Sequence, residues 1–291
     1  MRKLVFFIVA VLCIAMLAGC QPAQAPGTED TKKNEDTKND IDSGKKDPVV
    51  KTEKVIDVYQ EFTYSTTSGE VELPVRLYVP ADYSEEYAYP VLLFLHGAGE
   101  RGDDNEAQLK NVLQNLFDDP ESPVYQSIVV VPQCPEGKQW VMTPWEEGSY
   151  HLDDVPESEE LKSVISYLSE LEKEYSINKN RIYIMGISMG GFGTWNAIMR
   201  HPELFAAAMP VCGGADPSYA WKVKDLPIRT YHGDADTAVP VSGTREMSAA
   251  LKAEGAKDFT YIELAGYGHN VWDYASTDKA AIRWLFAQSK K

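Results

Sequence analysis

A serine between glycines is the first feature of this chain that could do chemistry. Residues 182–193 read "IYIMGISMGGFG", a run of β-forming residues that breaks into glycines around Ser188. Gly186 and Gly190 complete a Gly-x-Ser-x-Gly pattern, which between a strand and a helix forms a sharp turn that exposes the serine hydroxyl as a nucleophile. The five-residue pattern by itself is also compatible with a glycine-rich turn that happens to contain a serine.

A general base and an acid follow in the order that such a nucleophile requires, each after a later strand. His269 lies in "GYGHNVW" and is the only histidine downstream of the acid loop, so it is the candidate base. Two aspartates follow "IRTYHG", Asp234 and Asp236, and either could orient the imidazole. Together these residues predict attack of Ser188 on an acyl carbonyl, followed by hydrolysis of an acyl-enzyme.

Short apolar runs supply the strands that must position these residues. They alternate with amphipathic stretches and read "PVLLFLHG", "SIVVVPQ", "RIYIMGIS", "FAAAMPV", "IRTYHGD" and "FTYIELAG". Because strands that are apolar on both faces belong in a sheet covered on both faces, the pattern predicts an α/β fold with a mostly parallel, doubly wound sheet. The segment "EFTYSTTSGEVELPVRLYVP" predicts two strands joined by a turn at Ser68-Gly69, and therefore antiparallel strands at the N-terminal side.

In a doubly wound sheet, ligands gather at the carboxyl ends of the strands, which is where Ser188 is expected. The residues from Gly191 to Met199 predict a helix whose N-terminal amides face that serine. The backbone N–H of Met189 is therefore a candidate oxyanion donor.

Several motifs taken together resemble a known family across residues 60–289. They are "LFLHGAGERG" (93–102), "PQCPEG", "GISMGGFGTW", "HGDADTAVPV" and "GYGHNVW". The chain resembles an α/β-hydrolase of the esterase branch that includes feruloyl esterase-like and polyhydroxybutyrate depolymerase-like proteins. The resemblance implies an α/β-hydrolase fold and a serine carboxylic ester hydrolase.

The resemblance also implies roles for individual residues. The second oxyanion donor would be the backbone N–H of Ala98, with His96 orienting that loop rather than transferring protons. The segment "HGDADTAVP" resembles the Gly-x-x-Asp-x-x-Val-Pro pattern that carries the acid, which favours Asp236. Asp234 would then form a turn by binding backbone amides.

The substrate is less constrained than the reaction. The segment 215–225 is too short for the helical cap of many lipases, so an open site for short-chain, phenolic or carbohydrate-linked esters is expected. Trp140, Trp145 and Tyr150 could form an aromatic wall for a sugar or phenolic acyl group, or could only pack their loop onto the domain. Glu100 and Arg101 could form an ion pair or contact the substrate.

The N-terminal segment predicts export. Arg2 and Lys3 precede an apolar run over 4–16 that is long enough for a signal peptide and short for a membrane span. The following "LAGC" resembles the lipobox of bacterial lipoproteins, which implies cleavage after residue 19, lipidation of Cys20 and anchoring at the bacterial cell envelope, facing outward. Residues 20–50 are polar and predict a flexible tether, which leaves 51–291 as the catalytic domain.

Charge and motifs exclude other partners. The net charge of −16, or −18 after loss of Arg2 and Lys3, argues against nucleic acid as a partner. The chain has no His-Glu-x-x-His, paired Cys-x-x-Cys or phosphate-binding loop, so neither metal nor cofactor is expected. Cys134 and Cys212 follow different predicted strands, which disfavours a disulfide between them.

Other functions share these residues. A serine peptidase of the prolyl oligopeptidase type would use the same three side chains, although the chain lacks the large propeller domain that usually accompanies them. A thioesterase or acyltransferase is also compatible with the motifs. A catalytically inactive envelope binding protein is the non-enzymatic alternative, and the intact serine, acid and histidine argue against it.

Overall fold

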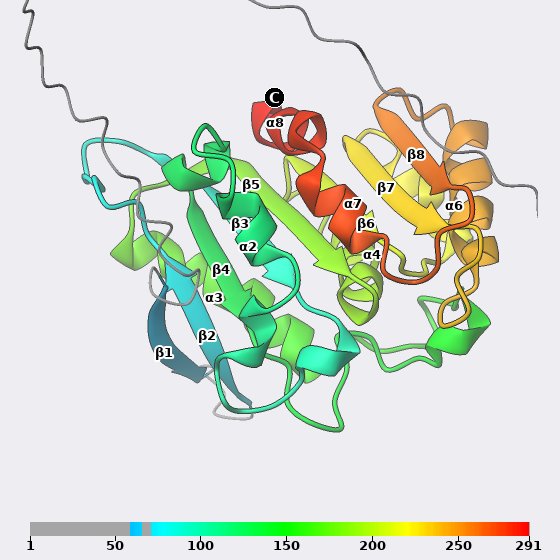
Figure 1. Cartoon of the computed structure of the whole chain (residues 1–291), viewed down its shortest axis with the longest axis horizontal. Coiled ribbons are helices and arrows are strands. Elements are labelled where there is room, and N and C mark those ends of the chain that lie inside the picture. Colours follow the sequence, from blue (N-terminus) through cyan, green and yellow to red (C-terminus); the bar gives the residue numbers. More distant parts are fainter. Residues whose placement is uncertain (1–58, 66–70, 291) are drawn as a thin grey trace, which may run out of the picture. The chain divides into compact units, whose positions relative to one another are not determined.

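An eight-stranded sheet forms the centre of the molecule (Figure 1). The computed structural model describes residues 59–65 and 71–290, so the predicted signal peptide, the lipidation site at Cys20 and the tether lie outside the described residues. The strand order is β1-β2-β4-β3-β5-β6-β7-β8. The strands are β1 (Gln60–Ser65), β2 (Glu72–Tyr78), β3 (Tyr89–Leu95), β4 (Ile128–Pro132), β5 (Ile177–Ile187), β6 (Ala207–Val211), β7 (Ile228–Gly233) and β8 (Phe259–Leu264).

The sheet is parallel except at its N-terminal edge. Strand β2 pairs antiparallel with both β1 and β4, while every pair from β4 to β8 is parallel. The predictions of a mostly parallel sheet and of antiparallel N-terminal strands are confirmed. The parallel strands end at one edge of the sheet, so the loops that follow β3, β5, β7 and β8 lie close together.

Helices cover both faces of the sheet. They are α2 (Leu113–Phe117), α3 (Glu159–Glu174), α4 (Met189–Arg200), α5 (Ala220–Val223), α6 (Val241–Ala253), α7 (Trp272–Thr277) and α8 (Lys279–Ala287). Short 3-10 turns are η1 (Ala98–Glu100), η2 (Ala107–Leu109), η3 (Pro123–Gln126), η4 (Trp145–Glu147) and η5 (Pro217–Tyr219). In Figure 1, α2, α7 and α8 lie over the near face of the sheet, and α3 and α4 lie behind it.

Alternation along the strands separates two apolar cores. In β3, Val91, Leu93 and Leu95 belong to the core that includes residues of α3, α4 and α6. Leu92 and Phe94 belong to the opposite core, with residues of α2, α7 and α8. All five side chains are buried, which explains why the sequence of β3 is apolar throughout rather than alternating.

The connection between β6 and β7 is short. It contains only η5 and α5, so the prediction that no large cap domain is inserted there is confirmed. The longer connection runs from β4 to α3, over residues 133–158, and its only regular element is η4. Among residues 59–65 and 71–290, no helix has the length and apolar character needed to cross a membrane.

Candidate active site

Ser188 occupies a strained turn between β5 and α4. Its backbone angles are φ 53° and ψ −118°, a positive φ that a residue with a side chain rarely adopts. A Cβ on Gly186 would lie 2.2 Å from the carbonyl oxygen of Gly190, and a Cβ on Gly190 would lie 1.9 Å from that of Leu95. The two glycines of the motif are therefore required by backbone contacts on both sides of the serine.

Three side chains form a continuous chain of hydrogen bonds. Ser188 Oγ lies 2.7 Å from His269 Nε2, and His269 Nδ1 lies 2.7 Å from Asp236 Oδ2. The carboxylate fixes the proton on Nδ1, so Nε2 is free to accept the proton of the serine hydroxyl. Ser188 follows β5, Asp236 follows β7 and His269 follows β8, so the fold brings together residues that are 81 and 33 positions apart in the chain.

The carboxylate of Asp236 is stabilised by four donors. Burial acts to raise its pKa, but hydrogen bonds from His232, His269 and the backbone N–H groups of Val239 and Ala238 outweigh it and hold the pKa well below the usual range. The side chain is fully buried, so Asp236 faces His269 as an ion whose position is fixed.

The structure distinguishes the two candidate aspartates. Asp236, which the sequence motif favoured, is the one that contacts His269. Asp234 is exposed and accepts a hydrogen bond from the backbone N–H of Gly266 at 2.6 Å, which is the turn-forming arrangement expected for it.

His232 is a member of the site that the sequence analysis missed. Its ring is fully buried, with Nδ1 2.7 Å from Thr244 Oγ1 and Nε2 3.1 Å from Asp236 Oδ2. The carbonyl of Val239 also lies 3.0 Å from Nε2, so a proton on Nε2 satisfies both acceptors. The only signal in the sequence is a polar residue at the end of a buried strand.

Two backbone N–H groups lie beside Ser188 without a partner. Ala98 is the first residue of η1, and Met189 is the first residue of α4. Neither N–H donates to a backbone acceptor within the described residues. Ala98 lines the pocket together with Ser188, and Met189 directly follows the serine, so both amides are candidates to bind an oxyanion.

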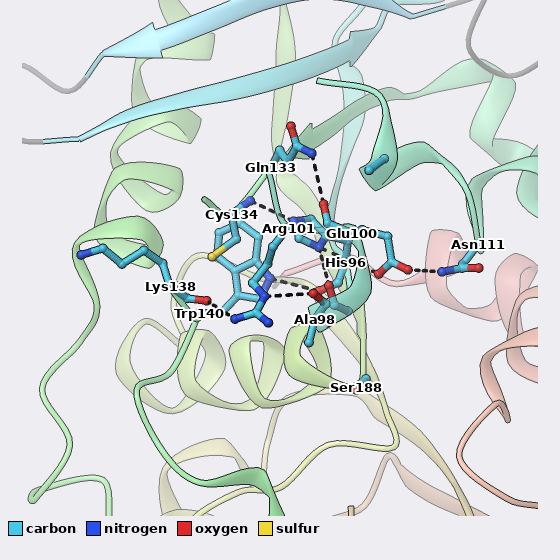
Figure 2. Close-up of polar contacts among 12 residues, drawn as sticks. His96, Ala98, Glu100, Arg101, Asn111, Gln133, Cys134, Lys138, Trp140 and Ser188 are labelled. Atoms are coloured by element: carbon cyan, nitrogen blue, oxygen red, sulfur yellow. Dashed lines mark hydrogen bonds and ion pairs between the residues drawn. The ribbon is translucent and has the colours of Figure 1, made fainter. Parts of the chain in front are cut away.

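His96 holds the loop that carries Ala98. Its Nε2 accepts the N–H of Cys134 at 2.8 Å, and its Nδ1 donates to the carbonyl of Gly97 at 2.6 Å. Trp140 Nε1 donates to the His96 carbonyl at 3.1 Å. Burial lowers the pKa of His96 to about 4, so the ring stays neutral and can accept as well as donate. Figure 2 shows this network above Ser188.

A pocket of about 310 Å³ opens at Ser188 and His269. Its remaining lining is mostly apolar and includes Trp145, Ile187, Val239 and Trp272, together with Gly97, Ala98, Gly99, Ala238, Glu100 and Asn111. The ring of Trp272 meets that of His269 edge to face, with centroids 5.2 Å apart. A second, smaller hollow of about 140 Å³ between α2 and α8 contains none of these residues.

The structure corrects part of the predicted aromatic wall. Trp145 lines the pocket, as the wall requires. Trp140 is fully buried and Tyr150 nearly so, because the first packs beside His96 and the second beside Phe192, so neither can contact a substrate. For these two residues the alternative, packing of the loop onto the domain, is the correct one.

Glu100 and Arg101 point in different directions (Figure 2). The guanidinium of Arg101 donates to the carbonyls of Ala98 at 2.9 Å and Lys138 at 3.2 Å and is absent from the pocket lining. The predicted ion pair does not form, because the carboxyl of Glu100 turns to Asn111 instead. Glu100 does line the pocket, so it is the member of the pair that can meet a substrate.

The loop that carries Trp145 is fastened by close backbone contacts. A Cβ on Gly214 would lie 2.1 Å from the carbonyl oxygen of Gly148, and a Cβ on Gly243 would lie 1.8 Å from it. Asp216 also accepts the N–H of Leu152 at 2.7 Å. These contacts hold the 133–158 connection against the segment that follows β6 and against the first turn of α6.

One group of potential metal ligands occurs within the described part of the chain. Atoms of Cys212, Asp236 and His269 lie within 4.8 Å of one another. The carboxylate and imidazole already bind each other, and burial raises the pKa of the Cys212 thiol far above its usual value, which disfavours the thiolate that a metal needs. Cys134 and Cys212 are both buried free thiols.

The sheet order, the strained serine turn and the hydrogen-bonded serine, histidine and aspartate define an α/β-hydrolase. A family model described as "Putative esterase" matches residues 66–287. The chain belongs to this esterase family.

Individual relatives agree with this assignment. The bifunctional acetylxylan esterase/xylanase XynS20E of Neocallimastix patriciarum is 28% identical over 241 residues, which are 69% of this chain and 33% of that protein. A solved thermostable esterase is 37% identical with a TM-score of 0.74, covering 81% of this chain and 64% of that one. The feruloyl esterase module of Clostridium thermocellum shares the fold at 17% identity and a TM-score of 0.56, covering 79% and 88%. The chain thus spans about a third of the length of the acetylxylan esterase/xylanase.

Proposed function

We propose that the chain is a serine esterase whose triad is Ser188, His269 and Asp236. The observation that carries this proposal is the unbroken hydrogen-bond chain from Ser188 Oγ through His269 to the buried carboxylate of Asp236, at the mouth of a pocket. His269 Nε2 takes the hydroxyl proton as Ser188 attacks the acyl carbonyl, and then returns it to the leaving alcohol. Water enters by the same route and releases the acid from the acyl-enzyme.

The tetrahedral intermediate places its oxyanion between the N–H groups of Ala98 and Met189. Both amides are held before substrate binds, the first by the His96 network and the second by the start of α4. Because these dipoles need no reorganisation during the reaction, each contributes roughly 10²- to 10³-fold to turnover.

The proposed substrates are short-chain, phenolic or carbohydrate-linked esters, either free or attached to a polymer. A pocket of about 310 Å³ with no cap domain over it accommodates a small acyl group better than a long alkyl chain. Trp145 and Trp272 offer aromatic faces to a planar acyl group or a sugar ring. The similarity to an acetylxylan esterase/xylanase supports the carbohydrate-linked class.

The proposed site of action is the outside of a bacterial cell envelope. The lipobox-like "LAGC" and the polar stretch after it support a lipid anchor at Cys20 and a tether that holds residues 51–291 away from the membrane surface. Metabolic labelling with an alkyne-tagged fatty acid tests this proposal, because Cys20→Ser would lose the label and appear in the soluble fraction. Labelling that persists in Cys20→Ser would contradict it.

The enzymatic proposal is tested with purified protein on p-nitrophenyl acetate, p-nitrophenyl laurate, methyl ferulate and a prolyl anilide. We expect turnover of acetate and ferulate well above laurate, and a loss on the order of 10⁶-fold in Ser188→Ala. A fluorophosphonate should add one label, at Ser188 by peptide mass. Ser163→Ala, on α3, is the matched control that keeps activity. Cleavage of the anilide alone would assign the protein to the serine peptidases instead.

A further inference from the structure

A buried carboxyl group lies in the pocket and has no role in the triad mechanism. Glu100 is the last residue of η1, two positions after the proposed oxyanion donor Ala98. The residue is only 8% exposed, yet it is among the residues that line the pocket at Ser188 and His269. A carboxyl group that is this buried normally has every oxygen paired.

Only one of its two oxygens is paired. Oε1 accepts a hydrogen bond from Asn111 Nδ2, and Figure 2 shows the two side chains pointing toward each other. Oε2 is buried and has no hydrogen-bond partner. A Cβ on Gly97 would lie 3.0 Å from Oε2 and 3.6 Å from Ser188 Cβ, so the unpaired oxygen is close to the nucleophile.

The groups around Oε2 do not satisfy it. His96 Nδ1 lies 4.0 Å away and donates to the carbonyl of Gly97 instead. Arg101 is turned toward Ala98 and Lys138. Burial raises the pKa of Glu100, although the nearby N–H of Gly97 and the amide of Asn111 act in the opposite direction. The carboxyl group of Glu100 is therefore largely removed from water, and the protein does not supply hydrogen-bond donors for both of its oxygens.

We propose that the carboxyl group of Glu100 accepts a hydrogen bond from a substrate hydroxyl close to the scissile ester, which makes Glu100 a specificity-determining residue. The inference rests on the proposed ester hydrolysis at Ser188 and narrows its substrates to esters of polyhydroxylated alcohols or of hydroxy acids. Apart from Asn111, Ser188 and His269, the rest of the pocket is lined mainly by apolar groups, so the Glu100 carboxyl group can distinguish a hydroxylated ester from its deoxy counterpart.

The preference should be measurable because a site built to bind a hydroxyl is left with an unpaired buried acceptor when that hydroxyl is missing. A hydrogen bond to a charged acceptor corresponds to a preference of roughly 10- to 100-fold in kcat/KM. Asn111 donates to Oε1, so the carboxyl group is oriented before substrate binds.

The test uses the full-length protein and pairs of esters in which a hydroxyl is replaced by a methyl group. On the alcohol side the pair is 2-hydroxyethyl acetate and propyl acetate, and on the acyl side it is methyl 3-hydroxybutanoate and methyl 3-methylbutanoate. p-Nitrophenyl acetate, which offers no hydroxyl, reports on the triad. The variants are Glu100→Gln and Glu100→Met, and Glu160→Gln is the matched control, since Glu160 is a buried glutamate on α3 outside the pocket.

We expect the wild-type protein to prefer the hydroxylated ester of at least one pair by roughly 10- to 100-fold in kcat/KM. Glu100→Gln should reduce that ratio several-fold and Glu100→Met should remove it, while Glu160→Gln keeps both the ratio and the turnover of p-nitrophenyl acetate. The pair that responds identifies which side of the ester carries the hydroxyl. Glu100→Gln preserves the shape of the side chain. If Glu100→Met does not fold, the ratio of kcat/KM values measured in Glu100→Gln is the test.

Three results would overturn the inference. An unchanged ratio in both Glu100 variants would make the Glu100–Asn111 pair structural, as would an equal loss on every ester together with a lower Tm. A stronger preference for methyl 3-aminobutanoate than for the hydroxy ester would replace the hydroxyl with an ammonium group. Failure of the wild type on every ester, p-nitrophenyl acetate included, would instead remove the proposed function itself.

Discussion

His232 and His269 meet at a single oxygen atom. Asp236 Oδ2 lies 3.1 Å from Nε2 of His232 and 2.7 Å from Nδ1 of His269, while Oδ1 accepts the N–H groups of Ala238 and Val239. The carboxylate therefore cannot rotate without losing several bonds. The orientation of the proposed general base depends on a buried histidine that is not itself near the serine.

The first prediction separates the two aspartates of the acid loop. Asp236→Asn should lower kcat roughly 10⁴-fold, because an amide can hold the wrong tautomer of His269. Asp234→Asn should lower it less than a few-fold, since that exposed residue only caps the N–H of Gly266. Steady-state kinetics on p-nitrophenyl acetate measures both, and equal losses in the two variants would contradict the assignment of the acid.

The second prediction concerns the two tryptophans of the 133–158 connection. Trp140→Ala should lower the free energy of unfolding by about 3–5 kcal/mol, because it removes a fully buried ring and the hydrogen bond to His96. Trp145 is partly buried against the same core, so Trp145→Ala should cost less stability than Trp140→Ala and should raise KM for methyl ferulate. Urea denaturation and kinetics on each variant test this, and a large stability loss in Trp145→Ala would show that this ring is also structural.

The third prediction concerns the glycines around the serine. Gly190→Ala should prevent folding or sharply lower Tm, since its Cβ would meet the backbone of Leu95 at 1.9 Å. Gly99→Ala has nothing within 4 Å of its Cβ and should leave Tm nearly unchanged. Thermal unfolding followed by circular dichroism is sufficient, and a Gly190→Ala protein as stable as the wild type would argue against the tight turn.

The fourth prediction is a loss of stability in mild acid. Burial lowers the pKa of His96 to about 4 in the folded chain, from the ordinary histidine value of 6.5. Between these values the unfolded chain binds a proton that the folded chain does not. The stabilisation is therefore present above pH 6.5 and is lost as the pH falls toward 4, by at most about 3 kcal/mol.

Two measurements check this pH dependence. The free energy of unfolding in urea should decrease from pH 7 to pH 4.5, and the decrease should be smaller in His96→Gln. In the wild-type protein, NMR of the imidazole ring should show His96 still neutral at pH 5. A His96 ring that titrates near pH 6.5 would contradict the burial argument.

Much of the architecture could be predicted because the relevant signals are local. Apolar runs such as "PVLLFLHG" mark strands buried on both faces, and the order of Ser188, Asp236 and His269 follows from where the fold places its loops. The glycines around Ser188 indicate a sharp turn, because larger side chains at these positions would prevent it from forming. The choice between Asp234 and Asp236 came from a motif, and the contact with His269 agrees with that choice.

The details of the pocket were not predictable in the same way. Trp140 and Trp145 lie in one irregular connection without periodicity, so the sequence cannot tell which ring faces inward. Glu100 turned to Asn111, a residue eleven positions away on a different turn, rather than to its neighbour Arg101. His232 lies at the end of β7, and no local pattern marks this polar side chain as part of the site. Each of these contacts depends on tertiary packing that local patterns do not encode.

The contacts of Gly148 with Gly214 and Gly243 bear on how the enzyme meets its substrate. A loop whose backbone is packed this closely against two other backbones cannot swing as a lid without separating all three. The protein should therefore show no interfacial activation, and its rate should follow dissolved substrate smoothly through the solubility limit. A change of substrate specificity should therefore follow from substitution of Trp145 in an unchanged backbone, and not from a change in the conformation of the loop.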